Sequence, residues 1–288
     1  MSRLENLQWD NRESGDTPLR QMQLVEVRLL KIVDYICRKH DLTYMLFWGS
    51  LLGAVRHKGF IPWDDDIDVW MSESDCRKFV KVAADELPND VFLQTCKTDD
   101  SYTLPWIKLR DNYSSVYTNV EEFNARHHVG ISLDIFPFVA YPKDSRIIRK
   151  LQHFTMLVGW FAMQRHARSF KTRLAHYFAI VPSFILEHVW WLLRKCCKLV
   201  AFGPHQLTGG VSSYVRFPID SILPTKEIVF EGQKFSAPAM PEFVLRQFYG
   251  DYMKLPPEEK RVPHESNIFP FTPCRHTHAM EYPKGGNK

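Results

Sequence analysis

The sequence of 288 residues predicts an α+β fold, in which a mixed β-sheet core is flanked by helices and carries a helical, basic and aromatic insertion. Helical and strand-like apolar patterns follow one another through residues 17–144, as expected for a sheet with helices packed on it. From residue 145 to about residue 207 the pattern becomes helical and rich in aromatic residues. Hydrophobic residues form 45% of the chain, enough for a packed core, so we exclude global disorder.

The first elements are expected in the following order. Thr17-Pro18 begins a long helix, because Pro is favoured at the first helical position and apolar residues then recur at helical spacing. A short buried strand at 43–48 ends at Gly49-Ser50, and a short helix leaves that turn.

A second strand is expected at 66–71. Ser72 caps the helix that follows and extends to about Leu87, with Asp75 at the capping-box position. Further strands are expected at 91–95, 104–109, 115–117 and 130–136.

Composition divides the chain into five segments. They are a polar N-terminal segment at 1–16, the core at 17–144, the helical insertion at 145–207, the C-terminal part of the core domain at 208–255, and a Pro-rich extended tail at 256–288. The N-terminal segment lacks the apolar region of a secretory signal. The six cysteines also lack paired spacing (Cys37, Cys76, Cys96, Cys196, Cys197 and Cys274). We therefore expect a reduced, cytoplasmic protein.

Four aspartates occupy five positions at the start of the second strand: Asp64, Asp65, Asp66 and Asp68. Side chains alternate along a strand, so Asp66 and Asp68 project from one face, about 7 Å apart. Two such carboxylates repel each other unless cations lie between them, and hard oxygen ligands favour Mg²⁺ or Mn²⁺. Asp64 and Asp65 are expected to cap the turn or to tune the metal shell.

Asp134 is the third predicted acid of this site. In the strand-like run 130–136, Ile131, Leu133 and Ile135 share one face, and Asp134 lies on the other. A lone carboxylate in a run fit for burial is unfavourable without a cation or hydrogen-bond donors. Asp66, Asp68 and Asp134 are therefore predicted to form a two-metal triad for phosphoryl transfer.

A solvated acidic turn, with Asp134 as an ordinary core acid, is the alternative explanation. A calcium loop is disfavoured, because the Gly and the terminal Glu of the EF-hand spacing are missing. Gly49-Ser50 favours the catalytic explanation, because a strand that opens directly into a helix presents backbone N–H groups where a phosphate can bind.

This order of motifs resembles the nucleotidyltransferase superfamily typified by polymerase β. The segment GAVRHKGFIPWDDDID (53–68) resembles one branch of it, the LicD family of phosphocholine transferases and fukutin-like proteins. The resemblance continues through KLRD (108–111), GISLDIFPF (130–138), FEGQKFSAP (230–238) and FYGDYMKLPP (248–257).

The resemblance implies a nucleotidyltransferase-type fold and transfer of a phospho-alcohol, phosphocholine first, from a CDP-activated donor to a sugar hydroxyl, with release of CMP. The acceptors that it implies are cell-surface glycans, such as lipopolysaccharide or teichoic acid, or their lipid-linked precursors. By position, Asp66, Asp68 and Asp134 would hold two Mg²⁺ or Mn²⁺ ions, and Gly49 and Ser50 would hold donor phosphate. Asp134 is the proposed acceptor of the proton from the sugar hydroxyl.

Five basic residues are expected to help bind the donor. Lys108 and Arg110 alternate onto one face of their strand, where they could clamp the pyrophosphate; a solvated strand edge is the alternative. Arg56, His57 and Lys58 lie on the loop that leads to the aspartates and are expected to contact donor or acceptor, unless the loop is a plain basic turn. A zinc site in the tail is disfavoured, because the spacing of Cys274, His276 and His278 is not a familiar structural pattern.

The insertion carries a strong positive charge between apolar clusters. Residues 146–198 contain ten Lys or Arg and one acid, Glu187, and Pro182 interrupts the longer apolar cluster. This composition favours helices that lie in a membrane interface at the inner face of the membrane, over a membrane span or a helical subdomain in water. Nucleic acid is not expected, because the basic residues accompany large aliphatic clusters rather than isolated stacking aromatics.

Three other functions are weighed against the transferase. A glycosyltransferase that uses an Asp-x-Asp motif and a nucleotide sugar explains Asp66 and Asp68, but not Gly49-Ser50 or Asp134. A non-catalytic protein that binds membrane or a partner would be favoured by loss of a triad acid, and all three are present. A template-free RNA polymerase lacks the expected basic groove outside the insertion.

Overall fold

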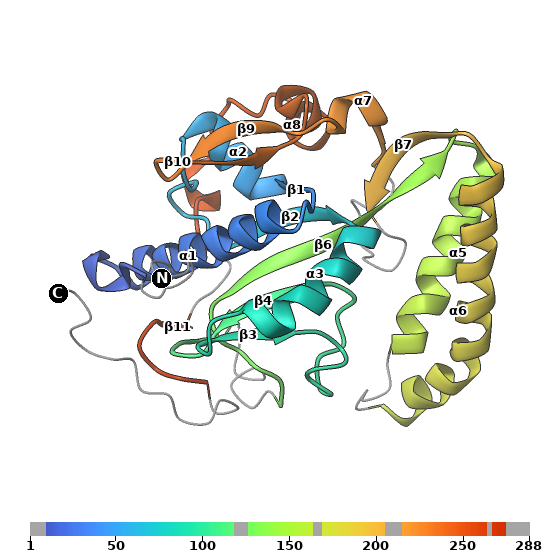
Figure 1. Cartoon of the computed structure of the whole chain (residues 1–288), viewed down its shortest axis with the longest axis horizontal. Helices are drawn as coiled ribbons and strands as arrows, with labels where there is room; N and C mark the ends of the chain where they lie inside the picture. The colour runs from blue at the N-terminus through green and yellow to red at the C-terminus, as the bar shows by residue number, and fades with distance from the viewer. Residues whose placement is uncertain (1–9, 118–125, 164–168, 205–214, 264–266, 275–288) are drawn as a thin grey trace.

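The computed structural model describes residues 10–117, 126–163, 169–204, 215–263 and 267–274 (Figure 1). Its centre is a seven-stranded mixed sheet in the order β1-β2-β6-β4-β3, with β7 beside β6 and β8 beside β7. The predicted α+β class with a mixed sheet is confirmed. His276, His278 and the ends of the predicted terminal segments, 1–9 and 275–288, lie outside the described residues.

The strands that matter for the site lie side by side. Their bounds are β1 (Tyr44–Leu46), β2 (Ile67–Ser72), β6 (Ser132–Pro142), β4 (Ile107–Asp111) and β3 (Val91–Gln94). Strand β2 runs parallel to β6, whereas β1, β4 and β3 pair antiparallel with their neighbours. Strand β6 extends past the expected end at Phe136, because its second half pairs with β7 (Leu199–Pro204).

Two helices begin where their capping residues predict. Helix α1 (Pro18–Lys39) follows Thr17, whose hydroxyl accepts the N–H of Arg20 at 3.1 Å. Helix α3 (Glu73–Glu86) follows Ser72, whose hydroxyl accepts the N–H of Asp75 at 3.0 Å. Local cap chemistry specifies both starts, and both predictions are confirmed.

Helix α2 (Trp48–Arg56) begins earlier than expected. Phe47 is its extended N-cap and accepts the first helical N–H, from Leu51, at 3.1 Å. Gly49 and Ser50 therefore lie in the first helical turn rather than in a turn before it. Trp48 takes a left-handed backbone with φ of 43°, an uncommon conformation for a bulky residue.

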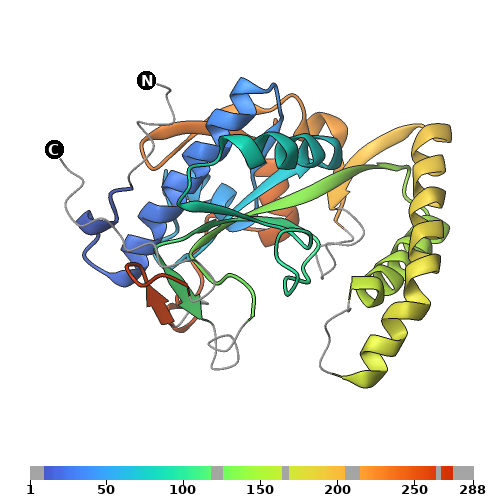
Figure 2. The ribbon, with the colours of Figure 1, turned by 60° about the horizontal axis from the view of Figure 1, so that its bottom comes forward.

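The insertion forms a helical hairpin that stands apart from the sheet (Figures 1 and 2). It consists of α5 (Arg146–Met163) and α6 (Phe170–Cys196), entered from β6 and left through β7. Pro182 lies inside α6, which continues through it. Among the described residues, no helix combines the length and the apolar character needed to cross a membrane.

The remaining elements pack on or beside the sheet. They are η2 (Arg12–Ser14), β5 (Ser115–Tyr117), β8 (Phe217–Pro218), α7 (Ile219–Ile222), β9 (Lys226–Phe230), β10 (Gln233–Ala237), α8 (Pro241–Tyr249), η4 (Glu258–Lys260) and β11 (Asn267–Phe269). In the described part of the tail, β11 pairs antiparallel with β5, and η4 forms a short 3-10 helix before it.

The N-terminal segment is anchored in the core, although its composition is polar. Arg12 is fully buried and forms ion pairs with Asp10 and Asp111, both at 2.6 Å. Its guanidinium also donates to the carbonyl of Pro270 in the tail at 2.5 Å. One buried cation therefore ties both ends of the described chain to the end of β4.

Candidate functional site

The predicted acids on β2 and β6 lie in register with each other and with a lysine on β4. Asp68 is aligned with Asp134 across the parallel pair, and Asp134 with Lys108 across the antiparallel pair. Neighbouring strands lie about 4.8 Å apart, and aligned residues point to the same face. The sheet therefore places two carboxylates and one ammonium in a row across three strands.

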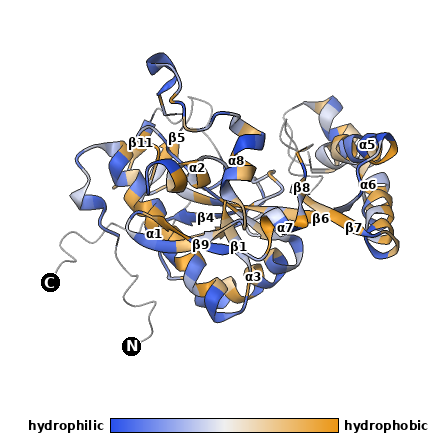
Figure 3. Ribbon diagram, turned by 90° about the horizontal axis from the view of Figure 1, so that it is seen from above, coloured by the Kyte–Doolittle hydropathy of each residue, from blue (hydrophilic) through white to orange (hydrophobic). Residues whose placement is uncertain are grey.

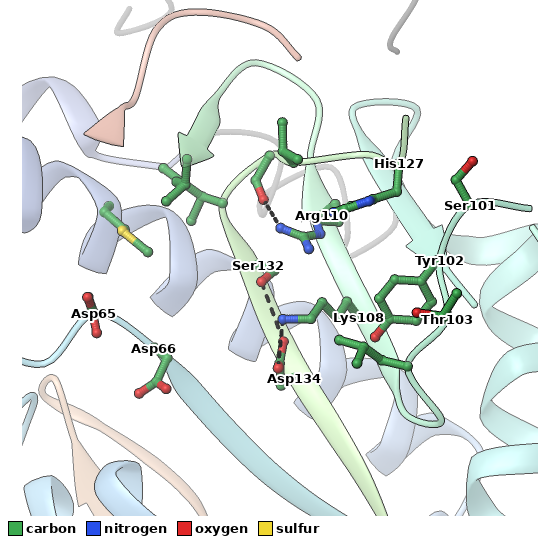
Figure 4. A pocket seen from close by; sticks show the side chains of 16 residues that line it. Asp65, Asp66, Ser101, Tyr102, Thr103, Lys108, Arg110, His127, Ser132 and Asp134 are labelled. Carbon is green, nitrogen blue, oxygen red and sulfur yellow. Dashed lines mark hydrogen bonds and ion pairs between the residues drawn. The ribbon is translucent and has the colours of Figure 1, made fainter. Parts of the chain in front are cut away.

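Asp134 is held by three hydrogen-bond donors, of which Figure 4 shows Lys108 and Ser132. Lys108 Nζ lies 2.8 Å from Asp134 Oδ2, and their side chains are 15% and 13% exposed. Trp106 Nε1 donates to Asp134 Oδ2 at 3.0 Å, and Ser132 Oγ donates to Oδ1 at 3.4 Å. In this arrangement the lysine ammonium supplies the positive charge that the carboxylate requires.

Asp68 lies among like charges. Burial, followed by the negative charges of Asp66 and Asp134, raises the pKa of the Asp68 carboxyl well above its ordinary value. The positive charge of Lys108 opposes this rise only in part. The backbone N–H of Asp68 donates to Ser50 Oγ at 2.8 Å, which fixes β2 to the first turn of α2.

The loop before β2 brings three further carboxylates together. Ligand oxygens of Asp64, Asp65 and Asp66 all lie within 4.8 Å of one another. Gln23 Nε2 of α1 donates to the carbonyl of Asp64 at 2.9 Å and holds the loop. Within the described part of the chain, Asp66 therefore belongs to a tight cluster with its two neighbours, and it lines the same pocket as Asp134.

These carboxylates fit a hard divalent cation. Their oxygens are the ligands that Mg²⁺ and Mn²⁺ prefer. The pKa of Asp68 is raised first by burial and then by the like charges of Asp66 and Asp134, which a cation would neutralise. Asp64, Asp65 and Asp66 have oxygens close enough together to share one ion, whereas Asp68 and Asp134 lie in register with each other on β2 and β6. Metal binding by Asp66, Asp68 and Asp134 stays a prediction.

Glu26 faces this cluster and was missed by sequence reasoning. It is fully buried on α1, and neither carboxyl oxygen has a hydrogen-bond partner among the residues that the structure describes. Burial, followed by the charges of Asp66 and Asp65, raises the pKa of Glu26 well above its ordinary value. Glu26 lies one helical turn after Met22, among the apolar residues that face the core along α1. An acid at a core-facing helical position is the sequence signal that could have identified it as a buried group.

Gly49 is required by the close approach of the acidic loop to α2. A Cβ at Gly49 would lie 2.9 Å from Asp64 Oδ2, closer than ordinary contacts allow. Ser50 is 2% exposed, and its hydroxyl binds the N–H of Asp68. The start of α2 and the acidic loop therefore form one packed unit, and the phosphate contacts of Gly49 and Ser50 stay predictions.

A pocket of about 330 Å³ opens beside the acids (Figure 4). Its polar wall includes Asp65, Asp66, Lys108, Arg110, Ser132 and Asp134, and Met22, Tyr102, Leu104 and Val116 add apolar surface. Arg110 is fixed there, because its Nε donates to Gln94 Oε1 at 2.7 Å and a terminal nitrogen donates to the Gly130 carbonyl at 2.6 Å. Lys108 and Arg110 thus lie on one pocket wall, as their alternation predicts.

Arg56, His57 and Lys58 do not line this pocket. Arg56 donates through Nε to His57 Nε2 at 2.8 Å and through a terminal nitrogen to the carbonyl of Tyr252 at 2.9 Å. Burial lowers the pKa of the Arg56 guanidinium, and the negative charge of Asp64 opposes that shift. Lys58 is exposed and takes a left-handed backbone with φ of 61°.

Tyr249 brings the FYGD segment to the same acids, a position for which sequence spacing gives no role. The residue is 43% exposed. Burial, followed by the charges of Asp68 and Asp64, raises the pKa of Tyr249 above its ordinary value. Gly250, with φ of 62°, ends α8 directly after it.

Comparisons with known proteins find a family model and curated relatives that match this chain. A family model described as LicD/FKTN/FKRP, nucleotidyltransferase domain, matches residues 41–178. The lipopolysaccharide cholinephosphotransferase LicD of Haemophilus influenzae is 30% identical over 259 residues, which cover 85% of this chain and 95% of that protein. An uncharacterized protein of Rickettsia prowazekii is 42% identical over 48 residues, 17% of this chain and 18% of that protein.

Proposed function

The chain belongs to the LicD/FKTN/FKRP family, and on that premise we propose that it is a metal-dependent transferase of phospho-alcohols. It moves a phospho-alcohol, phosphocholine first, from a CDP-activated donor to a hydroxyl of a cell-surface glycan or its lipid-linked precursor, and releases CMP. The row of Asp68, Asp134 and Lys108 beside the pocket is the observation that carries the proposal. The H. influenzae relative, named as a lipopolysaccharide cholinephosphotransferase, supports phosphocholine as the first donor group to test.

The donor diphosphate binds between the acids and the basic pocket wall. Asp66, Asp68 and Asp134 would hold Mg²⁺ or Mn²⁺, which would neutralise diphosphate charge and the charge on departing CMP. Lys108 and Arg110 contact the phosphates, since both lie on the pocket wall and guanidinium suits bidentate phosphate contact. Backbone N–H groups in the first turn of α2, at Gly49 and Ser50, add further donors.

The chemical step exchanges one phosphorus–oxygen bond for another. The acceptor hydroxyl gives its proton to the Asp134 carboxylate, and its oxygen attacks the phosphorus that carries the alcohol. The bond from that phosphorus to the CMP oxygen breaks, and CMP leaves with both bonding electrons. The Lys108 ammonium, 2.8 Å from Asp134 Oδ2, holds the carboxylate in position before the proton is transferred, and it lies close to the donor phosphates.

The proposal is tested by measuring whether the protein binds cytidine nucleotides in preference to uridine nucleotides, and whether binding requires a divalent metal. Calorimetric binding of CDP-choline, CDP-ribitol, CDP-glycerol, CMP and UDP-glucose is measured with and without Mg²⁺ or Mn²⁺. We expect metal-dependent binding of one CDP-alcohol, lost in Asp66→Asn/Asp68→Asn and retained in Asp85→Asn, which changes an exposed acid on α3. A uridine preference would favour the Asp-x-Asp glycosyltransferase, and no nucleotide binding with either metal would favour a non-catalytic binding protein.

A further inference from the structure

Helix α6 is apolar on two opposite faces. One face packs against α5 and the sheet extension through Ala179, Leu186 and Trp190, all buried. A second stripe points to solvent at intervals of three and four residues, with exposed fractions from 47% to 72%: Leu174, Tyr177, Phe178, Val181, Phe184, Ile185, Trp191 and Leu192. A surface helix of a globular protein is usually apolar on one face only. The outer stripe is therefore built to contact something other than the rest of the chain.

The hairpin holds this stripe on an ordered scaffold. Trp190 is fully buried, its Nε1 donates to Thr155 Oγ1 of α5 at 2.9 Å, and its ring packs edge-on against Tyr141 of β6. Helix α5 adds exposed Phe154 and Trp160, each 53% exposed. Hydrophobic colouring on these helices, at the edge of the molecule, is visible in Figure 3.

Basic residues surround the outer stripe. Lys171 and Arg173 lie exposed in the first turn of α6, and Lys195 lies exposed in its last turn. Arg194, also in the last turn, faces inward, where its side chain is 19% exposed and lies 3.9 Å from Glu73 of α3, so it is not one of the headgroup contacts. Between Leu174 and Leu193 the helix carries no Lys or Arg and one acid, Glu187. At 1.5 Å per residue the 27-residue helix is about 40 Å long, so the positive groups lie at both ends of a long apolar surface.

We propose that the α5–α6 hairpin binds the surface of a bilayer that contains anionic phospholipids. The outer stripe of α6 enters the interface, and the basic residues at the helix ends contact phosphate headgroups. Charge favours this occupant over a second copy of the chain, because two such hairpins would bring like charges together, with one acid against ten basic residues in 146–198. The membrane contact would bring the site to a lipid-linked acceptor, and this purpose rests on the proposed function. The membrane contact itself does not depend on the proposed function.

Vesicle co-sedimentation at physiological salt tests the proposal. The full chain is mixed with phosphatidylcholine vesicles, or with vesicles in which about a third of the lipid is phosphatidylglycerol. We expect at least about tenfold stronger binding to the anionic vesicles, since each basic residue near such a surface favours binding. Phe184→Glu/Trp191→Glu is expected to weaken binding about tenfold or more, because it places charge in the apolar contact.

Matched variants separate this contact from a general loss of structure. Val262→Glu adds one charge at an exposed apolar position (61%, against 65% for Phe184) far along the chain, and binding should be unchanged. Lys171→Glu/Arg173→Glu should weaken binding to anionic vesicles and leave any binding to neutral vesicles unchanged.

Three results would overturn the proposal. The first is no vesicle binding, and the second is binding by Phe184→Glu/Trp191→Glu that equals wild-type binding. The third is a wild-type dimer in sedimentation equilibrium that Phe184→Glu/Trp191→Glu converts to monomer. Nucleotide binding without vesicles is measured on the same samples. Its absence beside intact vesicle binding would refute the proposed function alone.

Discussion

Lys108→Met removes the positive charge that Asp134 contacts at 2.8 Å. Removing one partner of a buried ion pair costs about 3–5 kcal/mol in free energy of unfolding. This pair retains 15% and 13% exposure, and Trp106 still donates to Asp134, so we expect about 2–3 kcal/mol. For a chain of this size that corresponds to a fall in Tm of about 4–12 °C.

Divalent cations should reverse the loss. Mn²⁺ at 100 times its Kd adds about 2.7 kcal/mol to the free energy of unfolding, and in the variant it takes the place of the ammonium beside Asp134. Thermal unfolding is followed with and without Mn²⁺ for the wild type, for Lys108→Met and for Lys81→Met, which changes an exposed lysine on α3. If Lys108→Met is as stable as the wild type, or gains nothing from Mn²⁺, the assignment of Asp134 to a cation site is wrong.

Three further perturbations follow from buried groups. Glu26→Gln should flatten the pH dependence of the free energy of unfolding. In the folded chain the pKa of Glu26 lies well above 4.5, so the unfolded chain loses this proton at a lower pH than the folded chain does. The contribution of Glu26 to wild-type stability therefore falls as pH rises above about 4.5. Denaturant unfolding at pH 5 and pH 8 measures this, and parallel profiles would contradict it. Gly49→Ala places a Cβ 2.9 Å from Asp64 Oδ2, so CDP-alcohol binding should fall about tenfold or more by calorimetry; wild-type affinity would contradict the packing of loop on helix. Arg12→Met leaves Asp111 buried without its cation and should cost about 3–5 kcal/mol in denaturant unfolding, whereas a change under about 1 kcal/mol would show that the pair is not formed.

Features specified by local chemistry could be predicted from the sequence. Thr17 and Ser72 mark helix starts because each hydroxyl accepts an N–H three residues on, a contact that depends on nearby residues alone. Strand alternation also placed Asp134 opposite its apolar neighbours, toward the acid-lined pocket. These inferences need only the period of the element.

Features that depend on strand order or long-range packing could not be predicted in this way. The contact of Lys108 with Asp134 requires β4 to be the neighbour of β6, which no local pattern specifies. Glu26 reaches the acids from α1, about 40 positions away in the sequence. Conversely, His57 and Lys58 are close to the aspartates in sequence but do not line the pocket, so closeness in sequence alone does not place a side chain there.

The most direct test of the central claim is CMP release from CDP-choline. The purified chain is incubated with CDP-choline, Mg²⁺ and lipopolysaccharide or lipid-linked glycan acceptors, and CMP and acceptor-bound phosphocholine are measured together. We predict equal amounts of the two products, dependent on Mg²⁺ and lost in Asp134→Asn but not in Asp85→Asn. Product formation that is unchanged in Asp134→Asn, or consumption of UDP-sugars in place of CDP-alcohols, would contradict the account.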